Sequence, residues 1–223
     1  MPMDDPIWPL FGLRLSTPRL ELRPVRDDDV PHLVEAALAG IHEASRSPFS
    51  FPWTSVPDAE LPANTARHAW RTRAETGPGA WTLPFGVWCG SRMIGVQDVT
   101  ARDIPRLRTV QTGSWLTRSA QGRGYGREMR AAVLLYSFDH LGAGAAESDA
   151  AAWNSASLGV SSSLGYRPNG SRRQLWGDTV QEVRFTAVTP ETLVRPPWRL
   201  EVEGHAAAAA FLGLGPGDAA AER

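Results

Sequence analysis

The sequence is poor in cysteine and in long apolar runs. Cys89 is the only cysteine among 223 residues, and we interpret it as a small packed thiol at the end of an apolar strand. A single thiol excludes a disulfide framework and is typical of a reducing compartment. No apolar run is long enough to span a bilayer, and residues 1–9 lack the basic head of a signal peptide. We therefore expect a cytoplasmic protein that does not bind membranes.

An excess of charge of one sign is also lacking. Lys and Arg together number 23 and Asp and Glu 24, so the formal net charge is -1. This balance argues against a broad basic face, and we expect no nucleic-acid partner. The five histidines are scattered without the paired spacing of metal ligands, so we also expect no metal.

A glycine motif is the most informative feature that is present. Gln121-Gly122-Arg123-Gly124-Tyr125-Gly126 follows a predicted strand over residues 110–117 and precedes a predicted helix over residues 127–141. Alternate glycines let a ligand approach the backbone closely, and the first N–H groups of a helix favour an anion. The arginines at positions 123 and 127 add guanidinium groups that suit phosphate oxygens. The motif therefore predicts a phosphate or pyrophosphate cradle.

Two other phosphate-binding motifs fit this sequence poorly. The dinucleotide fingerprint needs its third glycine one residue later than Gly126, and it needs an acidic residue further on, which is missing. No Gly-Lys-Ser/Thr sequence follows the glycines, which argues against a P-loop and against ATP-dependent phosphotransfer with magnesium. A diphosphate bound without metal remains, and coenzyme A is the common ligand of that kind.

The motif resembles the pyrophosphate loop of the GNAT superfamily of N-acyltransferases. That loop reads Gln/Arg-x-x-Gly-x-Gly/Ala, and Gln121, Gly124 and Gly126 match it residue by residue. Other segments resemble the branch that contains the ribosomal-protein N-terminal acetyltransferases (RimJ and RimL), namely residues 17–24 with 27–29, 93–96, 113–116, Asn154 with Ser157, and 164–166. These segments occur in the expected order, which a chance match to one motif would not produce.

The resemblance implies an α/β fold with a single mixed, mostly antiparallel twisted sheet flanked by helices. We expect residues 1–12 to be an N-terminal extension, residues 13–189 the acyltransferase domain, and residues 190–223 a C-terminal strand and tail. A length of 223 residues fits one domain, or at most two.

Sequence patterns predict the elements of this domain. Strands are expected over residues 19–25, 81–88, 92–100, 110–117, 145–150, 171–176 and 181–189, and helices over residues 27–40, 64–76, 127–141 and 155–164. Residues 104–108 are interpreted as a connection and residues 206–210 and 213–223 as a trailing segment that ends in disorder. A late strand over residues 199–203 could close its own sheet or pair with a partner subunit, so a homo-oligomer stays open.

The resemblance implies acetyl-CoA or another short acyl-CoA as co-substrate, with the pantetheine arm along residues 114–117. The implied cofactor-binding residues are Trp115, Leu116, Thr117, Gln121, Gly122, Arg123, Gly124, Tyr125, Gly126, Arg127 and Asn154. In the alternative interpretation, the strand is ordinary core, Trp115 packs in it, and Asn154 caps a helix.

The resemblance identifies the catalytic residues less directly than the cofactor-binding residues. The tyrosine that protonates the thiolate in many family members would fall at Ser161, whereas in the ribosomal-protein branch the serine that corresponds to Ser157 has this role. We expect Ser157 to be the proton donor, with Ser161 second, unless both hydroxyls only bond to helix carbonyls one turn back.

The general base is left open by the sequence. The branch often has a glutamate where this sequence has Gln174, which cannot accept a proton. The remaining candidates are Asp98, Asp103, Glu128, Glu147 and Asp149. An α-amine, with a pKa of about 8, needs less help from a base than a lysine amine with a pKa of about 10.4. This difference favours an N-terminal or small-molecule amine.

Substrate contacts are expected from aromatic side chains of the loop over residues 48–53 and of the second helix, namely Phe49, Phe51, Trp53 and Trp70. We interpret Trp70 as lying on the inner face of its helix. Arg46 and Arg108 could pair with an anionic acyl group such as succinyl. In the alternative interpretation, these aromatic side chains only pack in the hydrophobic core and do not contact a substrate.

Together these patterns predict an enzyme, an acyl-CoA-dependent N-acyltransferase that moves an acetyl or other short acyl group such as succinyl to a primary amine. The acceptor could be a protein N-terminus, and the amine would attack directly in a ternary complex. A small-molecule or drug acetyltransferase is the alternative within the class. A non-catalytic acyl-CoA sensor is the alternative outside it, because the base is not evident.

Overall fold

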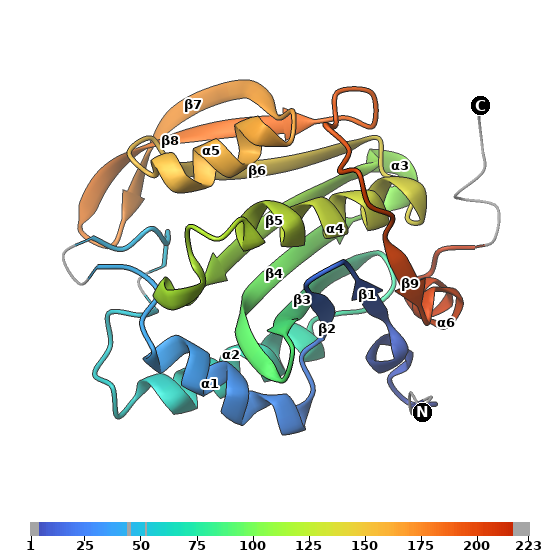
Figure 1. Cartoon of the computed structure of the whole chain (residues 1–223), viewed down its shortest axis with the longest axis horizontal. Coiled ribbons are helices and arrows are strands. Elements are labelled where there is room, and N and C mark those ends of the chain that lie inside the picture. The colour runs from blue at the N-terminus through green and yellow to red at the C-terminus, as the bar shows by residue number, and fades with distance from the viewer. Residues whose placement is uncertain (1–4, 44–45, 52, 216–223) are drawn as a thin grey trace.

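The computed structural model describes residues 5–43, 46–51 and 53–215. Across these residues, nine strands form one sheet in the order β7-β8-β6-β5-β4-β3-β2-β1-β9 (Figure 1). The pairs are antiparallel with one exception in the described sheet, the parallel pair of β5 and β6. The fold is therefore the single mixed, mostly antiparallel sheet flanked by helices that the sequence predicts.

The predicted elements occur in the predicted order along the chain, whereas the strand over residues 14–16 and the 3-10 helices over residues 9–12 and 118–120 were not predicted. The strands are β1 (Arg14–Ser16), β2 (Glu21–Pro24), β3 (Ala80–Cys89), β4 (Arg92–Arg102), β5 (Thr109–Leu116), β6 (Ala145–Ala151), β7 (Arg167–Trp176), β8 (Thr179–Val188) and β9 (Glu201–Glu203). The α-helices are α1 (Val30–Leu38), α2 (Leu61–Ala74), α3 (Ile104–Leu107), α4 (Tyr125–Asp139), α5 (Ser155–Ser163) and α6 (His205–Phe211), and the 3-10 helices are η1 (Pro9–Gly12), η2 (Asp27–Asp29) and η3 (Arg118–Ala120). No helix in the described ranges has the length and apolar character needed to cross a membrane.

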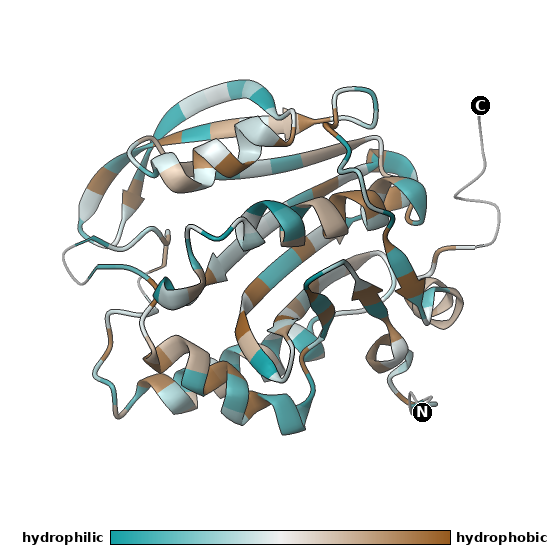
Figure 2. Ribbon diagram, in the orientation of Figure 1, coloured by the Kyte–Doolittle hydropathy of each residue, from teal (hydrophilic) through white to brown (hydrophobic). Residues whose placement is uncertain are grey.

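The sheet separates two apolar clusters, one on each face. On one face, the buried side of α4 packs on strand residues such as Val99 and Val110 in the larger cluster. On the other face, Leu33 of α1 and Ala69 of α2 pack with Val96 in a smaller cluster. Figure 2 shows apolar residues along the central strands and α4, whereas the outer strand β7 is largely polar and exposed. We call these the α4 face and the acceptor face.

The parallel pair is short, and this positions the site. Thr109 to Gln111 of β5 pair with Ala145 to Glu147 of β6, although β5 continues to Leu116 and β6 to Ala151. β6 instead continues its pairing with β8 on the other side. The two strands therefore separate beyond residues 111 and 147, and a gap opens between them toward the start of α4.

The C-terminal segment differs from the expectation for residues 206–210. These residues form most of α6, because alanine has the highest helix propensity and Ala208 is buried against the core. Gly204 precedes the helix at a φ of 72°, and a Cβ there would lie 2.2 Å from the Gly12 carbonyl oxygen. The last residues, 216–223, which we expected to be disordered, lie outside the described residues.

Two further segments refine the prediction. β9 pairs antiparallel with β1, so the late strand lies within its own sheet. The connection over residues 104–108 contains the short helix α3, with left-handed residues Asp103 and Arg108 on either side.

Gly95, in the segment 93–96 that resembles the family, has a steric role. A Cβ at this position would lie 2.2 Å from the Trp115 carbonyl oxygen and 2.9 Å from Leu116 Cα. The close approach lies at the last pair of the β4–β5 register, where Gly95 faces Leu116 at the end of β5. Glycine is therefore required here by the packing of two backbones.

We predict that Gly95→Ala destabilises the fold by about 2 to 3 kcal/mol, since backbone atoms must move to admit the methyl group. For a chain of this size the melting temperature should fall by about 5 to 10 °C, measured by calorimetry. Gly159→Ala in α5 is the matched control, because a Cβ there meets no atom within 4 Å. This control should be neutral or stabilise by up to about 1 kcal/mol. Equal stability of Gly95→Ala and the wild type would contradict the packing argument.

Candidate functional site: a cleft between diverging strands

A large cleft occupies the gap between β5 and β6. Its volume is about 1340 Å³, above the roughly 300 to 1,000 Å³ of sites for drug-sized ligands, so it has room for a large ligand. Its lining comes from residues 112–116 of β5, 148–150 of β6, the loop before α4 with the start of that helix, α5, α2 and the aromatic loop before α2. Segments far apart in the sequence therefore meet around the separation of the two strands (Figure 1).

The glycine loop forms one end of this cleft. Gly122 and Gly124 have φ values of 72° and 81°, in the left-handed region that favours glycine. No side chain caps the start of α4, and Gly122, Gly124, Gly126 and Arg127 line the cleft. The free N–H groups of the first turn and the Arg127 guanidinium together can hold a pyrophosphate.

Gln121, the first residue of the motif, holds the loop in place. Its side-chain nitrogen donates to the Ile41 carbonyl at 2.7 Å and to the Leu116 carbonyl at 2.9 Å. The Arg118 backbone N–H also donates to the Gly40 carbonyl, at 2.9 Å. These bonds fix the loop to the end of α1, so Gln121 lines the cleft and positions the glycines.

Three expected cofactor residues do not line the cleft. Thr117 is buried, at 1% exposure, with its hydroxyl 3.4 Å from that of Ser119. The Tyr125 ring lies under the Arg19 guanidinium at 4.6 Å, and the Arg123 carbonyl accepts from the same guanidinium at 3.1 Å. Trp115 and Leu116 do line the cleft.

Glu128 lies under the glycine loop, and both of its carboxylate oxygens accept hydrogen bonds. Its carboxylate accepts from Arg19 Nε at 2.6 Å, from the Arg19 backbone N–H at 3.1 Å and from the Thr17 hydroxyl at 2.7 Å. A buried, ion-paired carboxylate of this kind ties the N-terminal segment to α4. It is therefore not available as a general base.

The start of α5 brings Asn154 and Ser157 to the cleft. Asn154 is the N-cap, and its side-chain oxygen accepts from the Ser157 backbone N–H at 3.1 Å. No hydrogen bond of the Ser157 hydroxyl to another described residue is found, so this hydroxyl is free to bond to a ligand. Ser161 differs, because its hydroxyl is buried and donates to the Ser157 carbonyl at 3.2 Å.

Aromatic side chains cover the mouth of the cleft. The rings of Phe49 and Trp53 are 5.3 Å apart, and Trp53 lies 5.8 Å from Trp115 of β5. Arg46 stacks at 4.0 Å on Trp153, which follows β6. The loop therefore reaches both strands that border the gap. Phe51 also lines the cleft, with 74% of its surface exposed.

Trp70 lies elsewhere, contrary to our expectation of an inward position. Its indole N–H donates to Asp27 at 3.0 Å, and the side chain is 51% exposed. The inner face of α2 is instead formed by the buried residues Leu61, Thr65, Ala66 and Ala69. Arg108 is also absent from the cleft lining, and its backbone carbonyl accepts from the backbone N–H groups of Gly144 and Ala145.

Of the candidate bases, Asp98 and Asp149 line the cleft. Asp98 of β4 lies opposite Gly113 of β5 in the register, and a Cβ on Gly113 would lie 3.9 Å from Asp98 Oδ2. Since Gln111 pairs with Glu147, strand alternation puts Gly113 and Asp149 on the same face, the acceptor face. The carboxylates of Asp98 and Asp149 thus flank Gly113, which has no side chain.

The two carboxylates differ in charge environment. Burial raises the pKa of the Asp98 carboxyl to about 7. Burial also raises the pKa of Asp149, but the nearby Arg172 guanidinium acts in the opposite direction. A carboxylate with a pKa near 7 is suited to accept a proton at neutral pH. Asp103 is absent from the cleft lining and bonds to Arg106 at 3.2 Å, and Glu147 accepts from Asn169 at 3.4 Å.

Arg130 is a cleft residue that sequence reasoning missed. It lies in the apolar run of α4, is only 4% exposed, and donates hydrogen bonds to the hydroxyls of Ser114, Ser148 and Ser161. The one available signal was an arginine between Met129 and Ala131 on the buried side of the helix.

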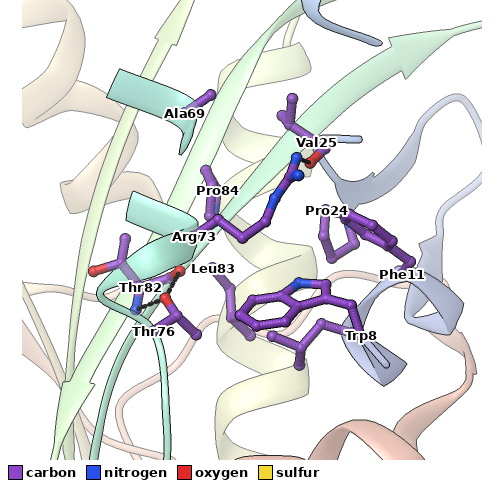
Figure 3. Close-up of a pocket in the computed structure, with 11 residues that line it drawn as sticks. Trp8, Phe11, Pro24, Val25, Ala69, Arg73, Thr76, Thr82, Leu83 and Pro84 are labelled. Atoms are coloured by element: carbon purple, nitrogen blue, oxygen red, sulfur yellow. Dashed lines mark hydrogen bonds between the residues drawn. The ribbon is translucent and has the colours of Figure 1, made fainter. Parts of the chain in front are cut away.

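A second hollow lies between α2 and the N-terminal segment (Figure 3). There Arg73 points toward the Val25 carbonyl and donates to it at 3.3 Å, while Trp8 and Phe11 close the other side. Its volume of about 20 Å³ is enough for one water molecule. It is therefore too small to be a substrate site.

The comparisons with known proteins agree with this geometry. The family model described as an acetyltransferase (GNAT) domain matches residues 19–167. The structure of Mycobacterium smegmatis RimJ in complex with CoA-disulfide has a TM-score of 0.68 and 20% identity, over 90% of this chain and 93% of that one.

Two other solved structures have the same fold. RimL, a ribosomal L7/L12 alpha-N-protein acetyltransferase in complex with coenzyme A, has a TM-score of 0.63 and 17% identity, over 78% of this chain and 95% of that one. A GNAT-family acetyltransferase from Bacillus anthracis has a TM-score of 0.64 and 15% identity, over 80% of this chain and 99% of that one. Since the family model covers more than half of the sequence, this chain belongs to the GNAT family of acyl-CoA-dependent acetyltransferases.

Proposed function

We propose that this enzyme transfers a short acyl group from acyl-CoA to a primary α-amine, with Asp98 as general base. The observation that carries the proposal is the half-buried Asp98 carboxyl beside Gly113, on the floor of the cleft, with a pKa raised by burial to about 7. A group with this pKa is ionised about half the time at neutral pH and can take a proton from an ammonium.

The positions of the glycine loop and of Asp98 in the cleft support direct attack of the amine on the thioester in a ternary complex. The glycine loop anchors the pyrophosphate at one end, so the pantetheine arm extends along β5 toward Gly113. The thioester then lies between the separated strands, and the amine reaches it from the acceptor face beside Asp98. Because Gly113 has no side chain, the nitrogen can approach the carbonyl carbon without obstruction. Positioning of this kind supplies much of the rate of an acyl transfer.

Ser157 is the proposed hydrogen-bond donor to the departing thiolate. Its hydroxyl lines the cleft at the start of α5 and makes no hydrogen bond to another described residue. Ser161 is not suited to this role, since its hydroxyl already donates to the Ser157 carbonyl and accepts from Arg130.

The acceptor that this site fits best is an α-amine, such as a peptide N-terminus. Asp98 and Asp149 attract the ammonium, and the aromatic loop offers the apolar surface that a peptide side chain needs. RimL, described as an alpha-N-protein acetyltransferase, shares the fold, which supports a protein N-terminus as the first acceptor to test.

We predict that Asp98→Asn lowers kcat/KM for a peptide α-amine by about 100-fold or more, as expected for loss of a general base. The test is a steady-state assay of CoA thiol release with an acyl-CoA and a short peptide. In the wild type, kcat/KM should rise with pH through an apparent pKa near 7, which is the value for Asp98. The variant should lose this limb of the profile, and binding of the acyl-CoA should not change. An unaltered pH profile in Asp98→Asn would contradict the assignment of Asp98 as general base.

Asp98 should also affect stability in a pH-dependent way. Its pKa is raised in the folded state from 3.8 to about 7, so the free energy of unfolding falls as pH rises between these two values, and the full cost is present at pH 8. We predict that Asp98→Asn raises the melting temperature relative to the wild type more at pH 8 than at pH 4. Melting curves at both pH values test this without any substrate, and the same shift at both values would contradict it.

For Ser157→Ala we expect kcat to fall about 10- to 100-fold, because a hydrogen bond to a charged sulfur is lost in the transition state. Ser162→Ala is the matched control, since Ser162 is exposed on the same helix and is absent from the cleft lining. Single-turnover kinetics separate the chemical step from product release. If both variants react at the wild-type rate, Ser157 is not the donor.

A further inference from the structure

Arg130 is a buried cation without an anion. Its Nη1 donates to Ser161 Oγ at 3.0 Å and to Ser148 Oγ at 3.3 Å, and its Nη2 donates to Ser114 Oγ at 3.0 Å. Its Nε is buried and has no hydrogen-bond partner in the part of the chain that the structure describes. Among the described residues, no carboxylate forms an ion pair with it.

This arrangement is unfavourable for a buried charge. Neutral hydroxyl dipoles replace only part of the hydration that a guanidinium loses on burial. Burial accordingly lowers the pKa of Arg130. Two of the hydroxyls also use their own protons elsewhere, Ser148 on the Thr112 carbonyl and Ser161 on the Ser157 carbonyl, so they present only lone pairs to the arginine. A carboxylate is the partner whose shape and charge match a guanidinium best.

The position of Arg130 indicates where such a carboxylate would come from. Its three hydroxyl partners belong to β5, β6 and α5, so the guanidinium lies under the gap between the strands, on the α4 face. A cofactor anchored at the glycine loop passes Leu116 and Trp115 before it reaches Ser114. The acyl group at the end of the pantetheine arm is therefore the part of the ligand that arrives beside Arg130.

We propose that the acyl donor is the CoA thioester of a short dicarboxylic acid, such as malonyl-, succinyl- or glutaryl-CoA. Its terminal carboxylate binds Arg130. An acetyl group would place only a methyl group beside the guanidinium and leave the charge uncompensated. This inference rests on the proposed acyl transfer and adds the identity of the donor. In this proposal Arg130 takes the place of Arg46 and Arg108 as the partner of an anionic acyl group. Arg46 stacks on Trp153, and Arg108 is absent from the cleft lining.

The reaction balances without another reactant. The amine nitrogen forms a bond to the thioester carbonyl carbon, the carbon–sulfur bond breaks, and CoA leaves as the thiol. The ammonium loses two protons on its way to the amide: Asp98 takes the first and passes it to solvent, and the second, lost after the carbon–nitrogen bond forms, ends on the departing thiolate. The product is an amide that keeps the free terminal carboxylate, so the acceptor changes from a cation to an anion.

Isothermal titration with CoA, acetyl-CoA and succinyl-CoA tests the proposal without an acceptor. The wild type should bind succinyl-CoA at least about tenfold more tightly than acetyl-CoA, as a buried charge-assisted pair warrants. Arg130→Met should abolish this preference and leave the affinity for CoA unchanged. Arg127→Met is the contrasting variant, because loss of a charge at the glycine loop should weaken all three ligands by a similar factor.

Each outcome has a definite meaning. Equal binding of acetyl-CoA and succinyl-CoA by the wild type, or a preference that persists in Arg130→Met, overturns the donor assignment and leaves the acyl transfer standing. Failure of the folded wild type to bind any of the three overturns the proposed function as well. Arg130→Met should fold with an equal or higher melting temperature, since a buried unpaired charge is removed. If it does not fold, the wild-type preference and its reduction in Arg130→Lys, which lacks the planar fork, decide the question.

Discussion

The separation of β5 from β6 is the constraint on which the site depends. Three residues of each strand pair in parallel, after which β6 stays with β8 while β5 stays with β4. Backbone groups along the separated edges are then left for a ligand, in the middle of an otherwise continuous sheet. The glycine loop and the first turn of α4 lie where β5 ends. The anion site at this loop and the unpaired edges of β5 and β6 therefore line the same cleft.

The sheet also divides the chemistry between its two faces. Asp98 and Gly113 lie on the acceptor face with the aromatic loop, where an amine can enter. Arg130 and its serine partners lie on the α4 face, beneath the same gap. In the proposed complex, the thioester lies between a base on one side and a cation on the other.

Both charged groups lower the free energy of unfolding. The pKa of Asp98 is raised by burial, and that of Arg130 is lowered by burial, so each environment disfavours the ionised form. Polar groups at such positions contradict the apolar pattern that a core alone would require. Their cost is understandable if ligand binding compensates it, which is the general relation between stability and function at active sites.

The sequence alone was enough to predict the glycine loop, the order of strands and helices, and the family. These features depend on local properties, namely glycine conformations, alternation of apolar residues and the start of a helix beside a phosphate site. It misassigned the alanine-rich segment now seen as α6, because alanine packing on η1 is a tertiary contact. It also placed Trp70 inward, although its helix buries the face of Thr65 and Ala69 instead. Only the tertiary structure places Asp98 beside Gly113 in the cleft and Arg130 beneath the gap, because burial and strand register are set by residues distant in the sequence.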